Sequence, residues 1–424
     1  MFLKDVERLV AKSNDKNFIY PLYDGYSLPN VMNYILENFK IKSNGKSLDR
    51  SITKNLHFKN ISKIVVILVD GLGYEMFKKN YKKCEFLDNF VKNGIVAPIT
   101  AGFPSTTAAA VTTMYTGLTP QEHAIHEWTV YFKEIGLVIN TLPFTSVYDD
   151  SQLAGKFNSI ILYKGHKFSD SLKKKVRMHI VLDKKLEKSA YNSLFRDDCN
   201  NIGYVENSDM AIELRRALQK EKHMAYFYVY ISSVDSVTHI YGPDTEESDA
   251  EIYAMARSLQ NGLQKIDKKT AEETLVILTA DHGHTKLDPR RVIYLNNDKK
   301  LSSWYARDSK NKIIPPTGSS RDVFFHIKED KLEMAYKHLS KRFGKTAKII
   351  KIRDAIKMGL FGRGKLNKKF VDRTGNLLLL PYANKGIWYE FVKDKKSPYK
   401  GMHGGLSRKE MLIPFAAARL SDVI

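Results

Sequence analysis

The chain has 424 residues, 43% hydrophobic and 27% charged, which is enough to bury the core of one large domain or two ordinary ones. Lysine and arginine outnumber aspartate and glutamate by 68 to 47, so the formal net charge is +21. Such a surplus points to an anionic partner or substrate. Much of it lies in scattered lysine runs such as "SLKKKVR", and we interpret it as general basicity rather than as one designed groove.

The chain contains two cysteines, Cys84 and Cys199, which exclude a disulfide framework and a cysteine-rich metal site. The first residues, "MFLKDVERLV", carry charge from the fourth position, and no apolar run has the length of a signal peptide or a membrane span. We therefore expect a cytoplasmic protein in a reducing compartment. Nothing in the sequence indicates an oligomeric state.

Three apolar runs each deliver an aspartate at or just after their end. They are "ISKIVVILVDGLG" with Asp70, "HMAYFYVYISSVD" with Asp235 and "ETLVILTADHG" with Asp281. Continuous β-branched and aromatic runs are typical of parallel strands that are buried on both faces. Ligands of open α/β sheets bind at the carboxyl ends of the strands, so these three acids are expected to gather at one site.

Helical patterns alternate with these strands. Segment 244–270 has acids first, apolar residues at helical spacing and lysines last, as a helix dipole favours. The fold class is therefore α/β, with a mostly parallel central sheet between helices. Elsewhere, the apolar patches 159–165 and 179–183 indicate short strands, 321–343 a strand followed by a helix, and 375–391 a hairpin.

Histidines follow two of the strand-end acids. His239 lies four residues after Asp235, His282 directly follows Asp281, and His403 lies between glycines in "GMHGG". Taken singly, a strand-end aspartate is more often a helix cap, and a lone histidine is more often held by hydrogen bonds. Together these side chains suit zinc, and two ions could clamp the attacking and leaving oxygens of a phosphoryl displacement.

Such a site needs a nucleophile, and "GFPSTTAAAVTTMYTG" (102–117) can supply one. A hydroxyl at the amino terminus of a helix gains from metal coordination and from the positive end of the helix dipole. The run of three alanines, Ala108 to Ala110, would let this helix pack closely behind the ions.

Five segments in this order resemble the alkaline phosphatase superfamily and, within it, the type I phosphodiesterase/nucleotide pyrophosphatase family. They are "VVILVDGLG", "FPSTTAAAVTTMYTGLTPQEHAI", "SVDSVTHIYGP", "TADHGHT" and "MHGGLSRKEMLIP", and they extend over most of the chain. The resemblance implies an alkaline-phosphatase-like fold, in agreement with the strand pattern.

The resemblance also implies the residues of a two-metal site. One zinc ion would be held by Asp235, His239 and His403. The second ion would be held by Asp70, Asp281, His282 and the nucleophilic hydroxyl of Thr107, which lies ten positions before Gly117. Manganese and iron accept the same donors. His284 is expected either to support the ligands from outside or to be structural.

The implied reaction has Thr107 attack phosphorus in line while metal ions stabilise the attacking and leaving oxygens, after which water hydrolyses the phospho-threonine. Family members present an asparagine to a phosphoryl oxygen soon after the "TG" helix. Trp128 stands at the matching position here, and an indole N–H is a different donor. We therefore name Trp128 and His126 as candidate substrate-binding residues; Glu127 and Thr129 are further candidates to take over the role of the asparagine.

We expect four parts in the chain. They are an N-terminal extension that packs on the core (1–55), a catalytic α/β core (56–295) with an insertion near 150–215, a cap-like α+β insertion (296–400), and a segment that completes the core and the metal site (401–424).

The leading functional prediction is a two-metal phosphodiesterase/nucleotide pyrophosphatase acting on a small, phosphorylated, nucleotide-like substrate. A phosphomonoesterase or phosphomutase of the same superfamily is the nearest alternative. A sulfatase is less compatible, because neither cysteine lies near the candidate nucleophile. From another class, the +21 charge suggests a nucleic-acid-binding protein, or nucleic acid as a substrate, although no recognisable nucleic-acid module is present.

Overall fold

A seven-stranded sheet forms the centre of the computed structural model, which describes residues 1–13, 15–43, 45–54, 56 and 58–424. The strand order is β2-β18-β9-β1-β8-β6-β7. The strands are β1 (Lys63–Val69), β2 (Ile95–Thr100), β6 (Arg177–Asp183), β7 (Cys199–Tyr204), β8 (Ala225–Ile231), β9 (Thr274–Thr279) and β18 (Leu412–Arg419). β18 runs antiparallel to both of its neighbours, and the other pairs are parallel. The predicted fold class is confirmed.

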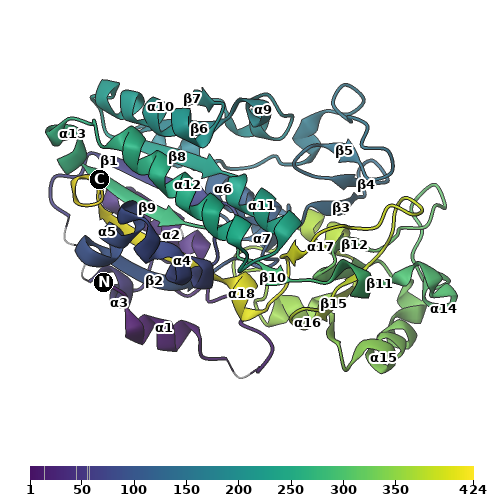
Figure 1. Cartoon of the computed structure of the whole chain (residues 1–424). Helices are drawn as coiled ribbons and strands as arrows, with labels where there is room; N and C mark the ends of the chain where they lie inside the picture. Colours follow the sequence, from purple (N-terminus) through teal and green to yellow (C-terminus); the bar gives the residue numbers. More distant parts are fainter. Residues whose placement is uncertain (14, 44, 55, 57) are drawn as a thin grey trace.

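Helices cover both faces of this sheet, which explains why β1, β8 and β9 are buried along their whole length. Figure 1 shows α10 and α12 in front of the sheet and α2 and α6 behind it. The helices of the core are α2 (Leu28–Asn38), α4 (Tyr74–Asn80), α5 (Glu85–Asn93), α6 (Thr107–Thr116), α10 (Asn207–Lys220), α11 (Ser233–Tyr241), α12 (Glu246–Leu263) and α13 (Lys268–Glu272).

Segment 296–400 builds a second, antiparallel sheet of order β12-β13-β15-β14. Its strands are β12 (Thr317–Ser319), β13 (Asp322–Phe325), β14 (Ala347–Lys351) and β15 (Leu377–Pro381). Alternate residues of its strands face opposite sides. Leu378 and Leu380 join the main core, whereas Leu377 and Leu379 join a separate cluster with Leu339 of α15 (Leu332–Phe343). The segment therefore has a core of its own and also packs on the main one.

Smaller elements complete the chain. The short sheets contain β3 (Thr129–Phe132), β4 (Leu137–Asn140) and β5 (Thr145–Ser146); β10 (Thr285–Lys286) and β17 (Gly401–Met402); and β11 (Ile293–Tyr294) and β16 (Ile387–Trp388). The remaining helices are α1 (Lys4–Val10), α3 (Arg50–Thr53), α7 (Pro120–His123), α8 (Phe168–Leu172), α9 (Lys184–Glu187), α14 (Lys299–Ser302), α16 (Ile352–Lys357), α17 (Lys368–Thr374) and α18 (Arg408–Met411).

Two local predictions are wrong. The hairpin expected over 375–391 does not form, because β15 pairs with β13 and β14 while β16 pairs in parallel with β11. The strand expected over 159–165 is a 3₁₀ turn at Ser159–Ile161, where the side chain of Asn158 caps the backbone N–H of Ile160. In both places the apolar pattern predicts a strand, but strand pairing depends on distant segments that the local pattern does not show.

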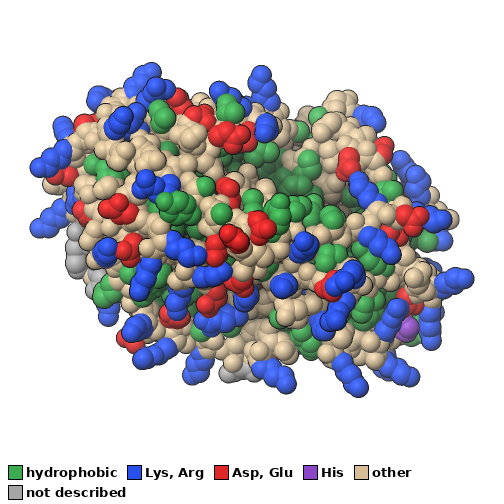
Figure 2. Space-filling view, in the orientation of Figure 1, with side chains coloured by type: hydrophobic (Ala, Val, Ile, Leu, Met, Phe, Trp, Pro, Cys, Tyr) green, Lys and Arg blue, Asp and Glu red, His purple; other side chains and the backbone are tan. Residues whose placement is uncertain are grey.

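The strand and helix expected over 321–343 are β13 and α15, and the strand at 179–183 lies within β6. Among the residues that the structure describes, no helix is both long and apolar enough to cross a membrane. Figure 2 shows lysine and arginine side chains spread over the visible face rather than gathered in one groove.

Candidate active site

The buried part of the site forms where β1 and β9 end side by side. Asp70 directly follows β1, and Asp281 and His282 follow β9. The Asp281 carboxylate accepts hydrogen bonds from the backbone N–H groups of Gly71 at 2.9 Å and His282 at 2.8 Å. The Tyr230 hydroxyl, which comes from β8, donates to Asp70. Three neighbouring strands therefore fix these carboxylates before any ligand binds.

A second group lies beside the first and is less deeply buried. Asp235 and His239 lie one turn apart on α11, so they share one face of the helix. His403 reaches the same point from the loop between β17 and α18. Its Nε2 lies 3.9 Å from Oδ1 of Asp235, and Nε2 of His239 lies 3.4 Å from the same oxygen.

The three histidines share one feature that prepares them to bind metal. Nδ1 of His239 faces the carbonyl oxygen of Gly401 at 2.8 Å, Nδ1 of His403 faces that of Ser105 at 3.1 Å, and Nδ1 of His282 faces that of Gly283 at 3.3 Å. A carbonyl oxygen only accepts, so in the neutral ring Nδ1 carries the proton and Nε2 keeps a free lone pair.

The spacing of the donor atoms fits tetrahedral ions. Two ligands bound about 2.1 Å from such an ion lie about 3.4 Å apart. In the buried group, Nε2 of His282 lies 3.4 Å from Asp70 and 3.2 Å from Asp281. Oδ2 of Asp281 is buried without a hydrogen-bond partner among the described residues, so it is free for a cation. The residues present therefore fit two metal ions, held by the groups Asp70, Asp281, His282 and Asp235, His239, His403, while Asp235, His282 and His284 form a third group that overlaps both.

The ionisation of the side chains in the candidate site also favours the binding of cations. Burial raises the pKa of Asp70, and the negative charges of Asp235 and Asp281 raise it further. Burial would raise the pKa of Asp235 as well, but the imidazoles of His239, His284 and His403 outweigh it and hold that pKa below its ordinary value. Burial lowers the pKa of His403 well below its usual range, so this ring stays neutral and able to coordinate.

Thr107 is the first residue of α6, at the helix end that carries the positive dipole. Its hydroxyl lies 3.2 Å from Nε2 of His282 and 3.5 Å from Oδ1 of Asp70, so it belongs to the buried group. Among the other hydroxyls of the stretch, Thr112 and Thr116 bond to backbone carbonyls of the preceding turn, and Ser105 bonds to the carbonyl of Gly405. The geometry thus separates Thr107 from its neighbours.

His284 contacts the second group from behind. Its Nε2 lies 2.8 Å from Oδ1 of Asp235, the shortest contact that this carboxylate makes with a histidine. Burial lowers the pKa of His284 to about 4. A neutral His284 that donates from Nε2 would orient Asp235, which is one of the two roles that the sequence leaves open for it.

Trp128 and His126, the two candidate substrate-binding residues, lie in different surroundings. Trp128 is 40% exposed and lines a pocket of about 470 Å³ together with Val111 and Tyr230. Tyr230 links this pocket to the candidate site because its hydroxyl donates to Asp70, although none of the predicted metal ligands lines the pocket. Figure 2 shows an apolar hollow at this place, between α9 and β5 of Figure 1. His126 is instead fully buried between Phe324 and Phe370.

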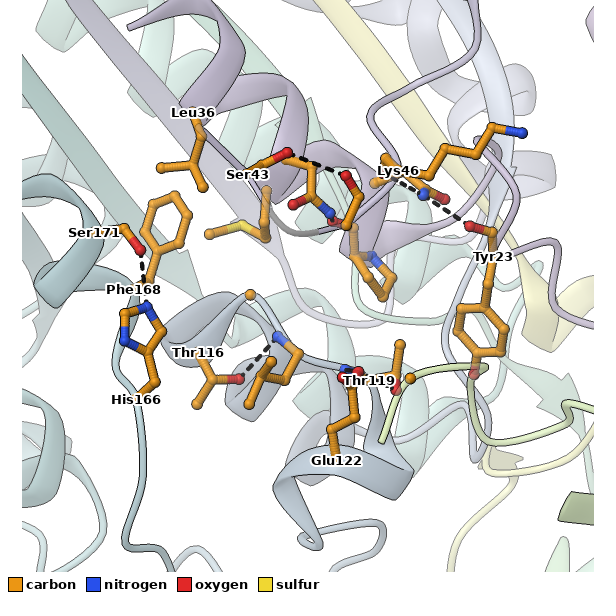
Figure 3. A pocket seen from close by; sticks show the side chains of 18 of the residues that line it. Tyr23, Leu36, Ser43, Lys46, Thr116, Thr119, Glu122, His166, Phe168 and Ser171 are labelled. Carbon is orange, nitrogen blue, oxygen red and sulfur yellow. Dashed lines mark hydrogen bonds between the residues drawn. The ribbon is translucent and has the colours of Figure 1, made fainter. Parts of the chain in front are cut away.

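A second pocket, of about 330 Å³, lies at the opposite end of α6 (Figure 3). Thr116, Gly117 and Thr119 line it, together with Leu36 of α2 and Phe168 of α8. This pocket is separate from the candidate active site, because it lies at the end of α6 away from Thr107 and none of the predicted metal ligands lines it.

The sequence reasoning missed Tyr230 and Asp322. Tyr230 belongs to an apolar strand whose pattern gives no sign that its hydroxyl holds Asp70. Asp322 lies in β13 but is fully buried, 0% exposed. An aspartate directly before an apolar run, as in "SRDVFFHI", is a signal that could have drawn attention to it.

A mostly parallel sheet with acids at its strand ends, imidazoles prepared to bind metal, and a hydroxyl at a helix start defines a metallohydrolase-like α/β protein. Comparison with known sequences specifies the family. A profile of the type I phosphodiesterase/nucleotide pyrophosphatase family matches residues 64–406, and the chain belongs to that family.

Individual relatives are more distant. A fission yeast (Schizosaccharomyces pombe) protein described as an uncharacterized pyrophosphatase/phosphodiesterase is 26% identical over 261 residues, which cover 58% of this chain and 50% of the relative. The chain thus matches about half the length of that relative.

Solved structures of ectonucleotide pyrophosphatase/phosphodiesterase 5 share the fold. The murine protein has a TM-score of 0.62 at 16% identity, covering 83% of this chain and 87% of its own. The human protein also has a TM-score of 0.62, at 17% identity, with 84% and 87% covered. An inactive threonine-to-alanine variant of the murine protein, in complex with AMP, matches equally well, with a TM-score of 0.62.

Proposed function

We propose that the chain hydrolyses phosphodiester or pyrophosphate bonds in a small, nucleotide-like substrate, with Thr107 as nucleophile and two divalent metal ions, preferably zinc, as cofactors. One observation carries the proposal: the Thr107 hydroxyl lies 3.2 Å from His282 and 3.5 Å from Asp70, inside a group of donors spaced for a metal ion. The family profile and the AMP complex of the murine neighbour support the reaction and the substrate class.

In this proposal, separate residues hold the two ions and orient the nucleophile. Asp70, Asp281 and His282 would hold one ion and Asp235, His239 and His403 the other. When bound, these ions would lower the pKa of the hydroxyl and offset the negative charge that develops on the phosphoryl group. The Thr107 hydroxyl donates its proton toward Oδ1 of Asp70, and the Tyr230 hydroxyl holds the other oxygen of that carboxylate.

The pocket beside Tyr230 would receive the organic part of the substrate. Its walls are largely aromatic and apolar, with Trp128 and Tyr191 among them, and Lys185 and Lys188 stand in the same lining. Aromatic walls suit a planar base, and lysines suit additional phosphate charge. Trp128 therefore serves as a wall of the substrate pocket in this proposal, where family members present an amide.

The test is hydrolysis of a nitrophenyl phosphodiester, a nitrophenyl monoester and a nucleotide pyrophosphate by metal-loaded protein. We expect faster turnover of the diester or the pyrophosphate, and a loss of at least about 10³-fold in kcat for Thr107→Ala. The matched control is Thr113→Ala on the same helix, whose hydroxyl bonds to the backbone of Leu118 instead. Faster turnover of the monoester would favour a monoesterase, and full activity of Thr107→Ala would refute the nucleophile.

The state of the two cysteines bears on the cellular location of the protein. Both cysteines are free, and Cys84 is buried. Free thiols are compatible with the reducing compartment that the sequence predicts, and a cytoplasmic protein remains our proposal. Localisation of the tagged full chain would test it directly.

A further inference from the structure

Two carboxyl groups outside the metal ligands meet in the interior of the protein. Glu127 precedes β3 and Asp322 begins β13, and both are 0% exposed. Their carboxyl groups lie within hydrogen-bonding reach of each other. Among the described residues, no lysine, arginine or histidine pairs with either acid, and the adjacent Arg321 is engaged by Glu410 at 2.8 Å.

Each acid has one oxygen that is held and one that is free. Glu127 accepts from the backbone N–H of Trp128 through Oε2, while its Oε1 has no partner among the described residues. Asp322 accepts from the hydroxyl of Ser319 at 2.5 Å and its N–H at 3.2 Å through Oδ1, while Oδ2 has none. The Thr106 hydroxyl, next to Glu127, is also buried without a partner that meets ordinary hydrogen-bond geometry.

Electrostatics excludes two charged carboxylates in this position. Burial raises the pKa of both acids, and the charge of Glu127 raises that of Asp322 further. One proton removes the repulsion and gives the pair a donor, because a protonated carboxyl donates to its ionised partner. The two titrations then belong to the pair rather than to either residue.

The pair connects the nucleophile to a metal-ligand loop. Thr106, at the N-cap of α6 directly before Thr107, lies against Glu127. Ser319, which holds Asp322, also lies 3.3 Å from the carbonyl oxygen of His403. Gly404 has φ +117°, and a Cβ there would come within 2.7 Å of Asp322, so the loop packs directly on the acid.

We propose that Glu127 and Asp322 share one proton and thereby act as positioning residues that fix the start of α6 against the His403 loop. The inference rests on the proposed function in taking Thr107 as the nucleophile. Neither acid contacts the reacting atoms in this proposal, and Glu127, which is fully buried, is not assigned the substrate-binding role of the asparagine. Glu410 also faces the pair, and its charge is neutralised by Arg321.

The shared proton also sets the direction of a pH effect. An acid whose pKa is raised in the folded state binds a proton that the unfolded chain has already lost. The contribution of the pair to stability is therefore fully present below the unfolded pKa and declines as pH rises through the folded value. At alkaline pH the two charges repel, and the start of α6 loosens.

The test compares conservative and truncating variants in full-length, metal-loaded protein. Glu127→Gln keeps a donor next to Asp322 and should retain kcat within about threefold, whereas Glu127→Ala should lose about tenfold in kcat with little change in KM. The wild-type kcat should fall at alkaline pH relative to Glu127→Gln, because only the wild type can lose the shared proton. Difference infrared spectra should show a protonated-carboxyl band in the wild type that is missing from Glu127→Gln and Asp322→Asn.

The infrared result does not depend on turnover, so it separates this inference from the proposed function. An unchanged carboxyl band in both amide variants would overturn the shared proton. So would equal loss of kcat in Glu127→Gln and Glu127→Ala. Release of an additional, third metal ion from Glu127→Gln would show that the pair binds a cation instead, and it would also overturn the proposal.

Discussion

The two groups of metal-ligand candidates differ in burial and in charge. Asp70, Asp281 and His282 are at most 2% exposed and supply two carboxylates for one imidazole. The group of Asp235, His239 and His403 is partly exposed and supplies two imidazoles for one carboxylate. Strand ends of the central sheet fix the first, whereas a helix and a loop supply the second. We infer that the buried group binds its ion more tightly and releases it more slowly.

Asp281→Ala should have the largest effect on activity among the variants of the two groups. This carboxylate anchors Gly71 and His282 as well as facing the ion, so its loss disturbs the whole buried group. We expect a loss of at least about 10³-fold in kcat that added zinc does not restore. Metal analysis should find one ion instead of two. Recovery of activity with zinc would contradict the greater importance of the buried group.

His239→Ala should have a smaller and partly reversible effect. Its partners Asp235 and His403 remain, and water can fill the open position of the partly exposed site. We expect about 10²-fold lower activity at limiting metal, with most of it restored by excess zinc. A chelator time course on the wild type should release one ion quickly and the other slowly. Two ions lost at the same rate would remove the predicted difference between the groups.

His284→Gln tests whether His284 orients Asp235 in the second group. Loss of the contact at 2.8 Å from His284 to Asp235 should weaken metal binding there about tenfold, since such supporting partners typically contribute 10- to 100-fold. Equilibrium dialysis against a zinc buffer would measure it. His338→Gln is the matched control, because that histidine also contacts a single aspartate, Asp298, at 2.8 Å but far from the site.

Trp128→Ala should have the smallest effect of the series. The indole would contribute a wall of the substrate pocket and leaves both metal groups intact. We expect KM for a nucleotide substrate to rise about three- to tenfold, and KM for a small nitrophenyl diester to change less. Equal changes for both substrates would place Trp128 near the phosphoryl group rather than near the organic part.

Much of the fold that positions the candidate site could be predicted from the sequence. The runs before Asp70 and Asp281 are long, apolar and β-branched, so their strand assignment needs no tertiary information. The pairing partners of β16 could not be predicted, because a strand of two residues carries no pattern and its partner lies nearly a hundred residues away.

Prediction of the candidate site from the sequence has the same limit, because local patterns do not show contacts between distant segments. Metal-ligand candidates could be recognised, because aspartate and histidine beside strand ends have few other roles in combination. The contacts of Tyr230 and the meeting of Glu127 with Asp322 depend on packing between segments that are 160 and nearly 200 residues apart. No local pattern encodes such contacts, and only the folded structure reveals them.

The position of β18 has a consequence for how the protein forms during synthesis. This strand lies between β2 and β9 in the sheet but is the last strand of the described chain, and His403 lies just before it. Until residues 401–419 leave the ribosome, β2 and β9 have open edges and one metal group lacks a ligand. Closure of the sheet and completion of the candidate metal site are therefore coupled steps, and a nascent chain stalled before them would present strand edges prone to aggregation.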